Sequence, residues 1–132
     1  MTRNRNDQLI VSDVQYPTGF AYSATPSLDV SANNAHVMTD EMTADMALTL
    51  LNGADGDAGV IMVAQDGTGG WKITDIAAAG RTVLMRDDLV TINTVAFKVA
   101  DAISLIAYEF VTVNGVGILF LSVSTGIAAA FT

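Results

Sequence analysis

The chain has 132 residues, of which 51% are hydrophobic and 15% are charged, so it is long enough to bury the core of one domain. Its formal net charge of −8 argues against binding to a nucleic-acid backbone, because that binding depends on a basic surface. The absence of cysteine excludes disulfides and thiolate metal sites.

Residues 1–35 are expected to form an extended N-terminal arm. They contain the polar stretch RNRNDQ, the turn signals YPTGF and SATPS, and no persistent apolar period. A polar segment of this kind needs something to hold it in place. We therefore expect the arm to lie on a neighbouring subunit. Its expected contact residues are Arg3, Arg5, Tyr16, Phe20 and Tyr22.

Residues 39–51 fit two patterns. Met42, Met46 and Leu50 fall on one face of a helix, whereas Met46, Leu48 and Leu50 alternate as in a strand. The turn signal NGADG follows directly. We favour a strand over residues 45–51 and keep a helix as the alternative.

From residue 58 onward, short apolar or alternating runs recur about every eight to twelve residues, with turn residues between them. The runs are GVIMVAQ, WKITDI, RTVLMR, DDLVTIN, VAFKV, AISLIAYEF and VGILFLSV. This spacing is typical of an all-β sandwich or barrel. The sequence therefore predicts one all-β domain over residues 36–132.

The first glycine-rich stretch, NGADGDAG at residues 52–59, is expected to be a structural turn. Its NG and DG pairs favour a hairpin. Asn52, Asp55 and Asp57 offer oxygen ligands, but the regular spacing of a calcium loop and its downstream glutamate are missing. The turn residues assigned here are Asn52, Gly53, Gly56 and Gly59.

The second glycine-rich stretch, AQDGTGGW at residues 64–71, lacks the spacing of a dinucleotide loop and the Lys and Ser/Thr of a phosphate loop. The alternating WKITDI follows it, so no helix N-terminus is available to bind an anion. We interpret it as a corner between strands, with glycines that need positive φ or a close backbone approach. Its assigned residues are Gln65, Asp66, Gly69 and Gly70.

No catalytic constellation is recognisable. His36 is the only histidine and has no nucleophile motif beside it. The acid pairs at residues 40–41 and 87–88 would point to opposite faces of a strand, so neither pair converges on one substrate. We assign no catalytic, cofactor-binding or metal-binding residue and expect a protein that is not an enzyme.

The last 23 residues, FVTVNGVGILFLSVSTGIAAAFT, carry no charge. Their length would span a bilayer, but glycines and polar residues interrupt them and no basic residue follows. A buried strand fits better, with a subunit interface to cover its apolar side chains. The residues assigned to this interface are Ile118, Phe120, Ile127 and Phe131.

Two stretches carry a resemblance to a known family. They are LTLLNGADGDAGVIMVAQDGTGGWKI and the later DLVTINTVAFKVADAISLIAYEFVTVNGVGILFLSVS. Residues 47–124, about 60% of the chain, resemble a β-rich module of tailed-bacteriophage virion proteins, such as tail fibres and head decoration proteins. Many members end in an aromatic hairpin similar to DGTNWY, where this chain has VTVNGVGILF.

The resemblance implies a β-sandwich or jelly-roll-like module, often trimeric and without catalytic activity, in which Gln65, Asp66, Gly69 and Gly70 belong to a structural turn. An arm plus one domain leaves no room for a fibre shaft. We therefore expect a homotrimeric capsid decoration or cement protein on the virion exterior, bound to the major capsid protein. The alternative is a small tail or head-fibre module that recognises host glycans.

Overall fold

The computed structural model describes residues 17–85, 95–96 and 102–128, and within these ranges the fold is all-β without a helix. The predicted all-β class is confirmed. The helical alternative for residues 39–51 is wrong, because residues 46–51 form a strand and no helix lies between residues 39 and 45. The predicted run DDLVTIN lies outside the described residues. The strands are β1 (Thr18–Phe20), β2 (Ser27–Asp29), β3 (Ala35–Met38), β4 (Met46–Leu51), β5 (Ala58–Ala64), β6 (Lys72–Ala78), β7 (Thr82–Met85), β8 (Val95–Ala96), β9 (Ala102–Val113) and β10 (Val116–Ala128).

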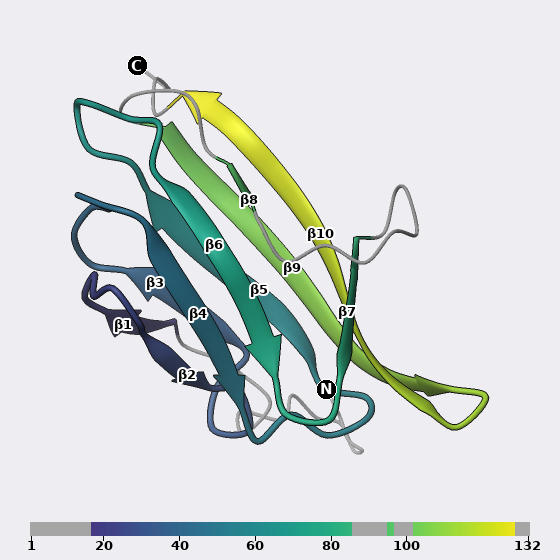
Figure 1. The fold of residues 1–132 in the computed structure, drawn as a ribbon. Helices are drawn as coiled ribbons and strands as arrows, with labels where there is room; N and C mark the ends of the chain where they lie inside the picture. Colours follow the sequence, from purple (N-terminus) through teal and green to yellow (C-terminus); the bar gives the residue numbers. More distant parts are fainter. Residues whose placement is uncertain (1–16, 86–94, 97–101, 129–132) are drawn as a thin grey trace, which may run out of the picture.

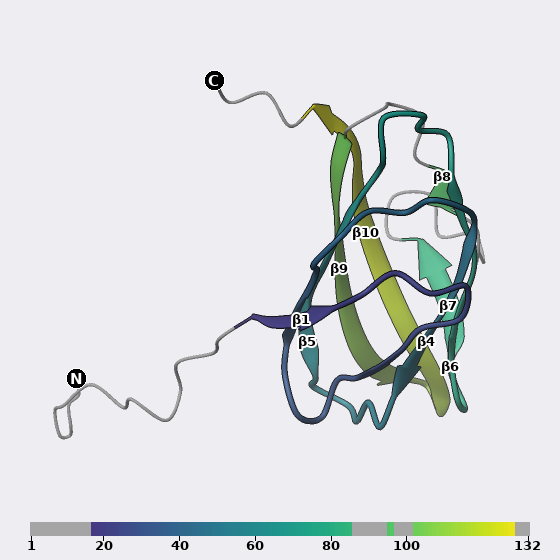
Figure 2. The ribbon, with the colours of Figure 1, turned by 90° about the vertical axis from the view of Figure 1, so that its left-hand side faces the viewer.

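The strands form two mixed sheets that lie one on the other (Figures 1 and 2). The six-stranded sheet has the order β1-β3-β5-β9-β10-β7, and the four-stranded sheet has the order β2-β4-β6-β8. Strands β1, β3 and β5 pair in parallel, and so do β2, β4 and β6. Successive strands from β1 to β6 alternate between the sheets, so this part of the chain winds as a coil of parallel strands.

The two Asn-Gly pairs behave differently. Asn114 and Gly115 join β9 to β10 as a hairpin, with φ of 51° and 78°, the signs that a type I′ turn requires. Asn52 also has a positive φ, of 62°, but Gly53 does not. A Cβ on Gly53 would overlap the ring of Phe110. The hairpin predicted over residues 52–59 is therefore wrong, because this loop carries the chain from β4 to β5 in the other sheet.

The core lies between the sheets and is filled by alternate residues of each strand. Met46, Leu48 and Leu50 of β4 are each 1% exposed, as the period-2 pattern predicts. The six-stranded sheet supplies inward side chains of the same kind, among them Ile61 and Ile106, which are fully buried. Burial of this apolar surface is the main force that holds the layers together.

The sheets begin earlier in the chain than the expected arm allows. β1 pairs with β3, and β2 pairs with β4, so strand pairing starts at Thr18 and not after residue 35. Phe20 and Tyr22 are partly buried against the chain's own core. The Tyr22 hydroxyl donates to the Asp45 carbonyl at 3.0 Å. Residues 1–16, which include the other expected arm contacts Arg3, Arg5 and Tyr16, lie outside the described residues.

Candidate functional site

The stretch AQDGTGGW forms the corner at which the chain leaves β5 for β6 in the other sheet. The amide of the buried Gln65 binds the backbone of Trp71 twice: its Oε1 accepts the N–H at 3.0 Å, and its Nε2 donates to the carbonyl at 3.3 Å. Asp66 Oδ1 accepts the backbone N–H groups of Thr68 and Gly69, both at 3.0 Å, and the indole N–H of Trp71 at 2.9 Å. The polar groups of the corner thus bind one another.

The conformation and charge of this corner fit a structural turn. Gly69 and Gly70 have φ of 70° and 81°, a region that favours glycine. The backbone N–H of Gly69 holds the pKa of Asp66 below its ordinary value, and the indole of Trp71 adds to this effect. The corner fixes the partly buried Trp71 against the core.

The loop between β4 and β5 is also tied into the chain. Asn52 Nδ2 donates to Asp29 Oδ2 at 3.1 Å, and Asp57 Oδ2 accepts the backbone N–H of Ala54 at 2.9 Å. Gly56 has φ of 94°, and a Cβ on Gly59 would overlap the carbonyl of Asn34. Asn52 and Asp57, two of the residues considered as calcium ligands, thus take part in hydrogen bonds within the chain.

Arg81 connects the loop between β4 and β5 to β9. Its Nη1 donates to Asp55 Oδ1 at 2.6 Å and to the carbonyl of Val111 at 3.0 Å, and its guanidinium lies 5.3 Å from the centre of the Phe110 ring. A hydrogen bond from Thr112, followed by that from Arg81, lowers the pKa of Asp55.

The groups considered for catalysis do not converge in the described part of the chain. His36 is 3% exposed and its Nε2 lies 3.2 Å from the carbonyl oxygen of Asn33. Asp40 Oδ1 accepts the backbone N–H of Tyr22 at 2.7 Å. Residues 87–88 lie outside the described residues. Among the side chains described, no cluster of three or more His, Cys, Asp or Glu is placed to hold a metal ion.

The uncharged C-terminal segment forms the end of β9 and all of β10. In β10, Leu119 and Leu121 point into the core, whereas Phe120 pairs across the sheet with Glu109 and Leu84 on the opposite, outward side. Ile118 is 8% exposed but does not belong to the core cluster. Ile127 pairs through its backbone with Ile103, and Phe131 lies beyond the described residues. No helix in the described ranges is long and apolar enough to cross a membrane.

The outward side of the six-stranded sheet is apolar over most of its width. Register places the following outward-facing, partly exposed residues together on four strands: Val37 on β3, Val60, Met62 and Ala64 on β5, Leu105, Ala107 and Val111 on β9, and Phe120 on β10. Ile103 on β9 is 42% exposed. We call the outward side of strands β3, β5, β9, β10 and β7 the apolar face. Glu109 is its one charged side chain among those described.

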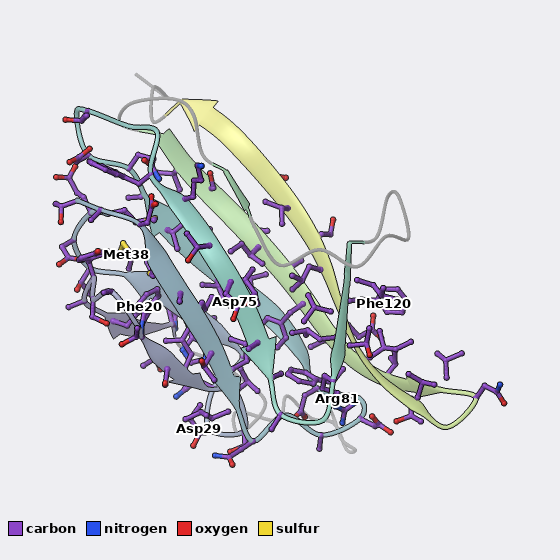
Figure 3. The ribbon with its side chains drawn as sticks, viewed as in Figure 1. Phe20, Asp29, Met38, Asp75, Arg81 and Phe120 are labelled. Atoms are coloured by element: carbon purple, nitrogen blue, oxygen red, sulfur yellow. The ribbon has the colours of Figure 1, made fainter. Side chains whose placement is uncertain are left out.

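The outward side of the four-stranded sheet is mostly polar, although Leu51 at the end of β4 is 41% exposed there. The polar positions on this side include Ser27, Asp29, Thr49, Lys72 and Asp75. The register shifts in a β-bulge at Thr74, which lies between the pairs Met46–Ile73 and Ala47–Asp75. Thr74 and Asp75 are both exposed. Figure 3 shows Asp29 and Asp75 on this layer, and Phe120 on β10. We call this side the polar face.

A polar hollow of about 270 Å³ lies where the loop after β2 meets the start of β5. Ser31, Asn33, Asn34 and Asp57 contribute to its lining, and no aromatic residue does. Amides, hydroxyls and carboxylates of this kind bind neutral polar ligands such as sugars through hydrogen bonds.

The sequence interpretation selected only the C-terminal part of the apolar face, through Ile118 and Phe120. It missed the contributions of β3 and β5. A signal was present, because GVIMVA and AISLIA are nearly continuous apolar runs and not alternating ones, which indicates strands with apolar residues on both sides.

Comparison with known proteins found no match to the chain among family models, curated proteins or solved structures.

Proposed function

We propose that the chain is a non-enzymatic structural protein of a virion, a capsid decoration or cement protein that stabilises the shell as a homotrimer. The observation that carries the proposal is the apolar face, a sheet surface that no other described part of the chain covers, on a chain of net charge −8. A structural protein covers such a surface when it assembles. The resemblance of residues 47–124 to phage virion modules supplies the setting.

The arrangement of the two sheets supports a more specific fold. The two layers around one core agree with a β-sandwich module. Parallel pairing among β1 to β6 differs from the antiparallel Greek keys of a jelly roll. We therefore propose a sandwich-like module whose N-terminal half is a parallel coil.

In this proposal the N-terminal residues 1–16 contact the major capsid protein, through Arg3, Arg5 and Tyr16. They precede β1, the edge strand of the six-stranded sheet. Phe20 and Tyr22 are partly buried against the chain's own core, so we assign the contact to the three residues that precede β1. Deleting residues 1–16 is expected to abolish binding to capsids in a sedimentation assay and to leave the oligomer intact. Full binding by the truncated chain would contradict this role for the arm.

The setting is tested by the copy number of this chain in purified particles, measured against the major capsid protein by quantitative mass spectrometry. Decoration predicts a number comparable with that of the capsid protein. A handful of copies per particle would place the chain at a tail, vertex or fibre tip and overturn the decoration role.

The second candidate is a receptor-binding module for host glycans, and the polar hollow near Asn33 and Asp57 favours it. A glycan array with the isolated protein distinguishes the two functions. Binding that is lost in Asn33→Ala and kept in Thr49→Ala, a substitution on the polar face, would favour the receptor-binding function.

A further inference from the structure

We infer that the apolar face is the surface through which copies of this chain associate, with Phe120 at the contact. The inference deepens the proposed function and rests on it only in taking the chain for a structural component. Three observations identify a second copy as the occupant: the distribution of charge, the size of the face and its relief.

Charge is the first observation. The chain carries fourteen acidic and six basic residues, so two copies repel each other over most of their surfaces. Of the nine acidic residues in the described ranges, only Glu109 lies on the apolar face. The other eight lie on the polar face or in the loops, such as Asp75 on β6 and Asp66 at the corner. Copies of one acidic chain therefore meet at least cost through the apolar face, whereas a basic partner would find few acids there.

Size is the second observation. Neighbouring strands lie about 4.8 Å apart and rise about 3.3 Å per residue. The five strands have 4, 7, 12, 13 and 4 residues, and together they give a face of roughly 630 Å² in projection. The smallest stable specific interfaces bury about 600 Å² per partner, and side-chain relief adds accessible area to a flat projection. The face is thus close to the size that self-association needs.

Relief is the third observation. Phe120 stands on β10 beside a hollow of about 90 Å³, where the small residues Ala107 and Ser122 face outward (Figure 3 labels Phe120). Glu109 also contributes to the lining of this hollow. A large side chain next to a row of small ones is a knob beside a hole. Because every copy carries both, the knob of one copy is complementary to the hole of another.

Glu109 limits the strength of this association. It lies on the central strand β9 between Ala58 of β5 and Phe120 of β10, and it is exposed. Ala58, Ala107, Val111 and Phe120 surround it on this face, and none of them carries a charge to balance it. In an assembly, the carboxylates of neighbouring copies approach one another, so replacing Glu109 by glutamine should strengthen the contact.

The test uses the full chain and sedimentation velocity over a range of concentrations. We expect the wild type to associate, Phe120→Asp to be monomeric, and Phe120→Ala to dissociate at least about 30-fold more readily, as truncation of a central aromatic anchor does. Glu109→Gln should associate more tightly. Thr49→Asp is the matched control, because it places the same charge on a central strand of the polar face, and it should associate like the wild type. Urea unfolding of each variant checks that it is folded.

A wild type that stays monomeric at high concentration, or a folded Phe120→Asp that associates normally, would overturn the inference. A monomeric wild type that still binds capsids would overturn both the inference and the trimer of the proposed function, and would leave only the capsid-binding role standing. Association through this face without capsid binding would support the inference and contradict the proposed capsid-binding function. A dimer in place of a trimer would support the role of the face and correct the trimer of the proposed function.

Discussion

The six-stranded and the four-stranded sheet share one core but present different side chains to the outside. On β4, buried Met46, Leu48 and Leu50 alternate with outward residues such as Thr49. On β5 and β9 the outward positions are apolar as well, as Met62 and Leu105 show. A strand with one buried side needs apolar residues only at every second position. The extra apolar residues of the six-stranded sheet are therefore not required by the core and indicate a second contact.

Substitutions on the inner and the outer side of β9 should differ most in their effect on the free energy of unfolding. Ile106 points inward and is fully buried, whereas its neighbour Leu105 points outward and is partly exposed. We expect Ile106→Ala to lower the free energy of unfolding by about 2–5 kcal/mol, because it leaves a cavity in the core. Leu105→Ala should lower it by less than about 1 kcal/mol in dilute protein. Urea unfolding of both variants at low concentration measures the difference, and equal losses would mean that the single chain already covers its outer face.

The corner between β5 and β6 is expected to make the free energy of unfolding depend on pH through Asp66. The hydrogen bonds that lower the pKa of Asp66 stabilise the fold above the ordinary aspartate pKa of 3.8, and this stability is lost as the pH falls and the carboxylate is protonated. Unfolding at pH values from about 5 down to about 3 should show the decline.

In Asp66→Asn this decline should be smaller. Trp71→Phe removes one hydrogen-bond donor to Asp66 and keeps an aromatic ring. Its loss of stability on acidification should lie between those of the wild type and Asp66→Asn. An unchanged pH dependence in Asp66→Asn would show that the charge of the corner contributes nothing to the stability of the joined layers.

The smallest expected effect concerns Tyr108 on the inner side of β9. Its hydroxyl is buried without a hydrogen-bond partner among the described residues, and burial raises its pKa. Tyr108→Phe should therefore leave the free energy of unfolding unchanged or raise it by up to about 1 kcal/mol, since it removes an unsatisfied polar group. A loss of more than 1 kcal/mol would show that the hydroxyl has a partner in solution.

The positions of the strands could be predicted because the core imposes a local pattern. Alternation in MALTLL and apolar runs in VIMVA and AISLIAYEF located β4, β5 and β9. Sheet partners could not be predicted, because a period of two specifies which side a residue faces and not which strand lies beside it. The parallel coil therefore had no signature in the sequence.

The two Asn-Gly pairs show the same limit at the level of a turn. Both have an asparagine with positive φ, but Gly53 is held against Phe110, a residue 57 positions later in the chain. Such a long-range contact is invisible to a local turn rule. The apolar face was only partly predictable for a related reason, since its width depends on β3 and β5 lying beside β9, which only the pairing reveals.

The central claim is that the apolar face becomes covered when copies of the chain associate, whereas the polar face stays exposed to solvent. A single introduced thiol tests this claim directly, because the chain has no cysteine of its own. Ser122→Cys places the thiol on the apolar face and Thr49→Cys places it on the polar face, at positions of similar partial exposure. The rate of reaction with a thiol reagent is then measured across protein concentrations. We expect the thiol at position 122 to be protected at high concentration and to react faster on dilution, while the thiol at position 49 reacts at one rate throughout. Equal and concentration-independent rates at both positions would contradict the account.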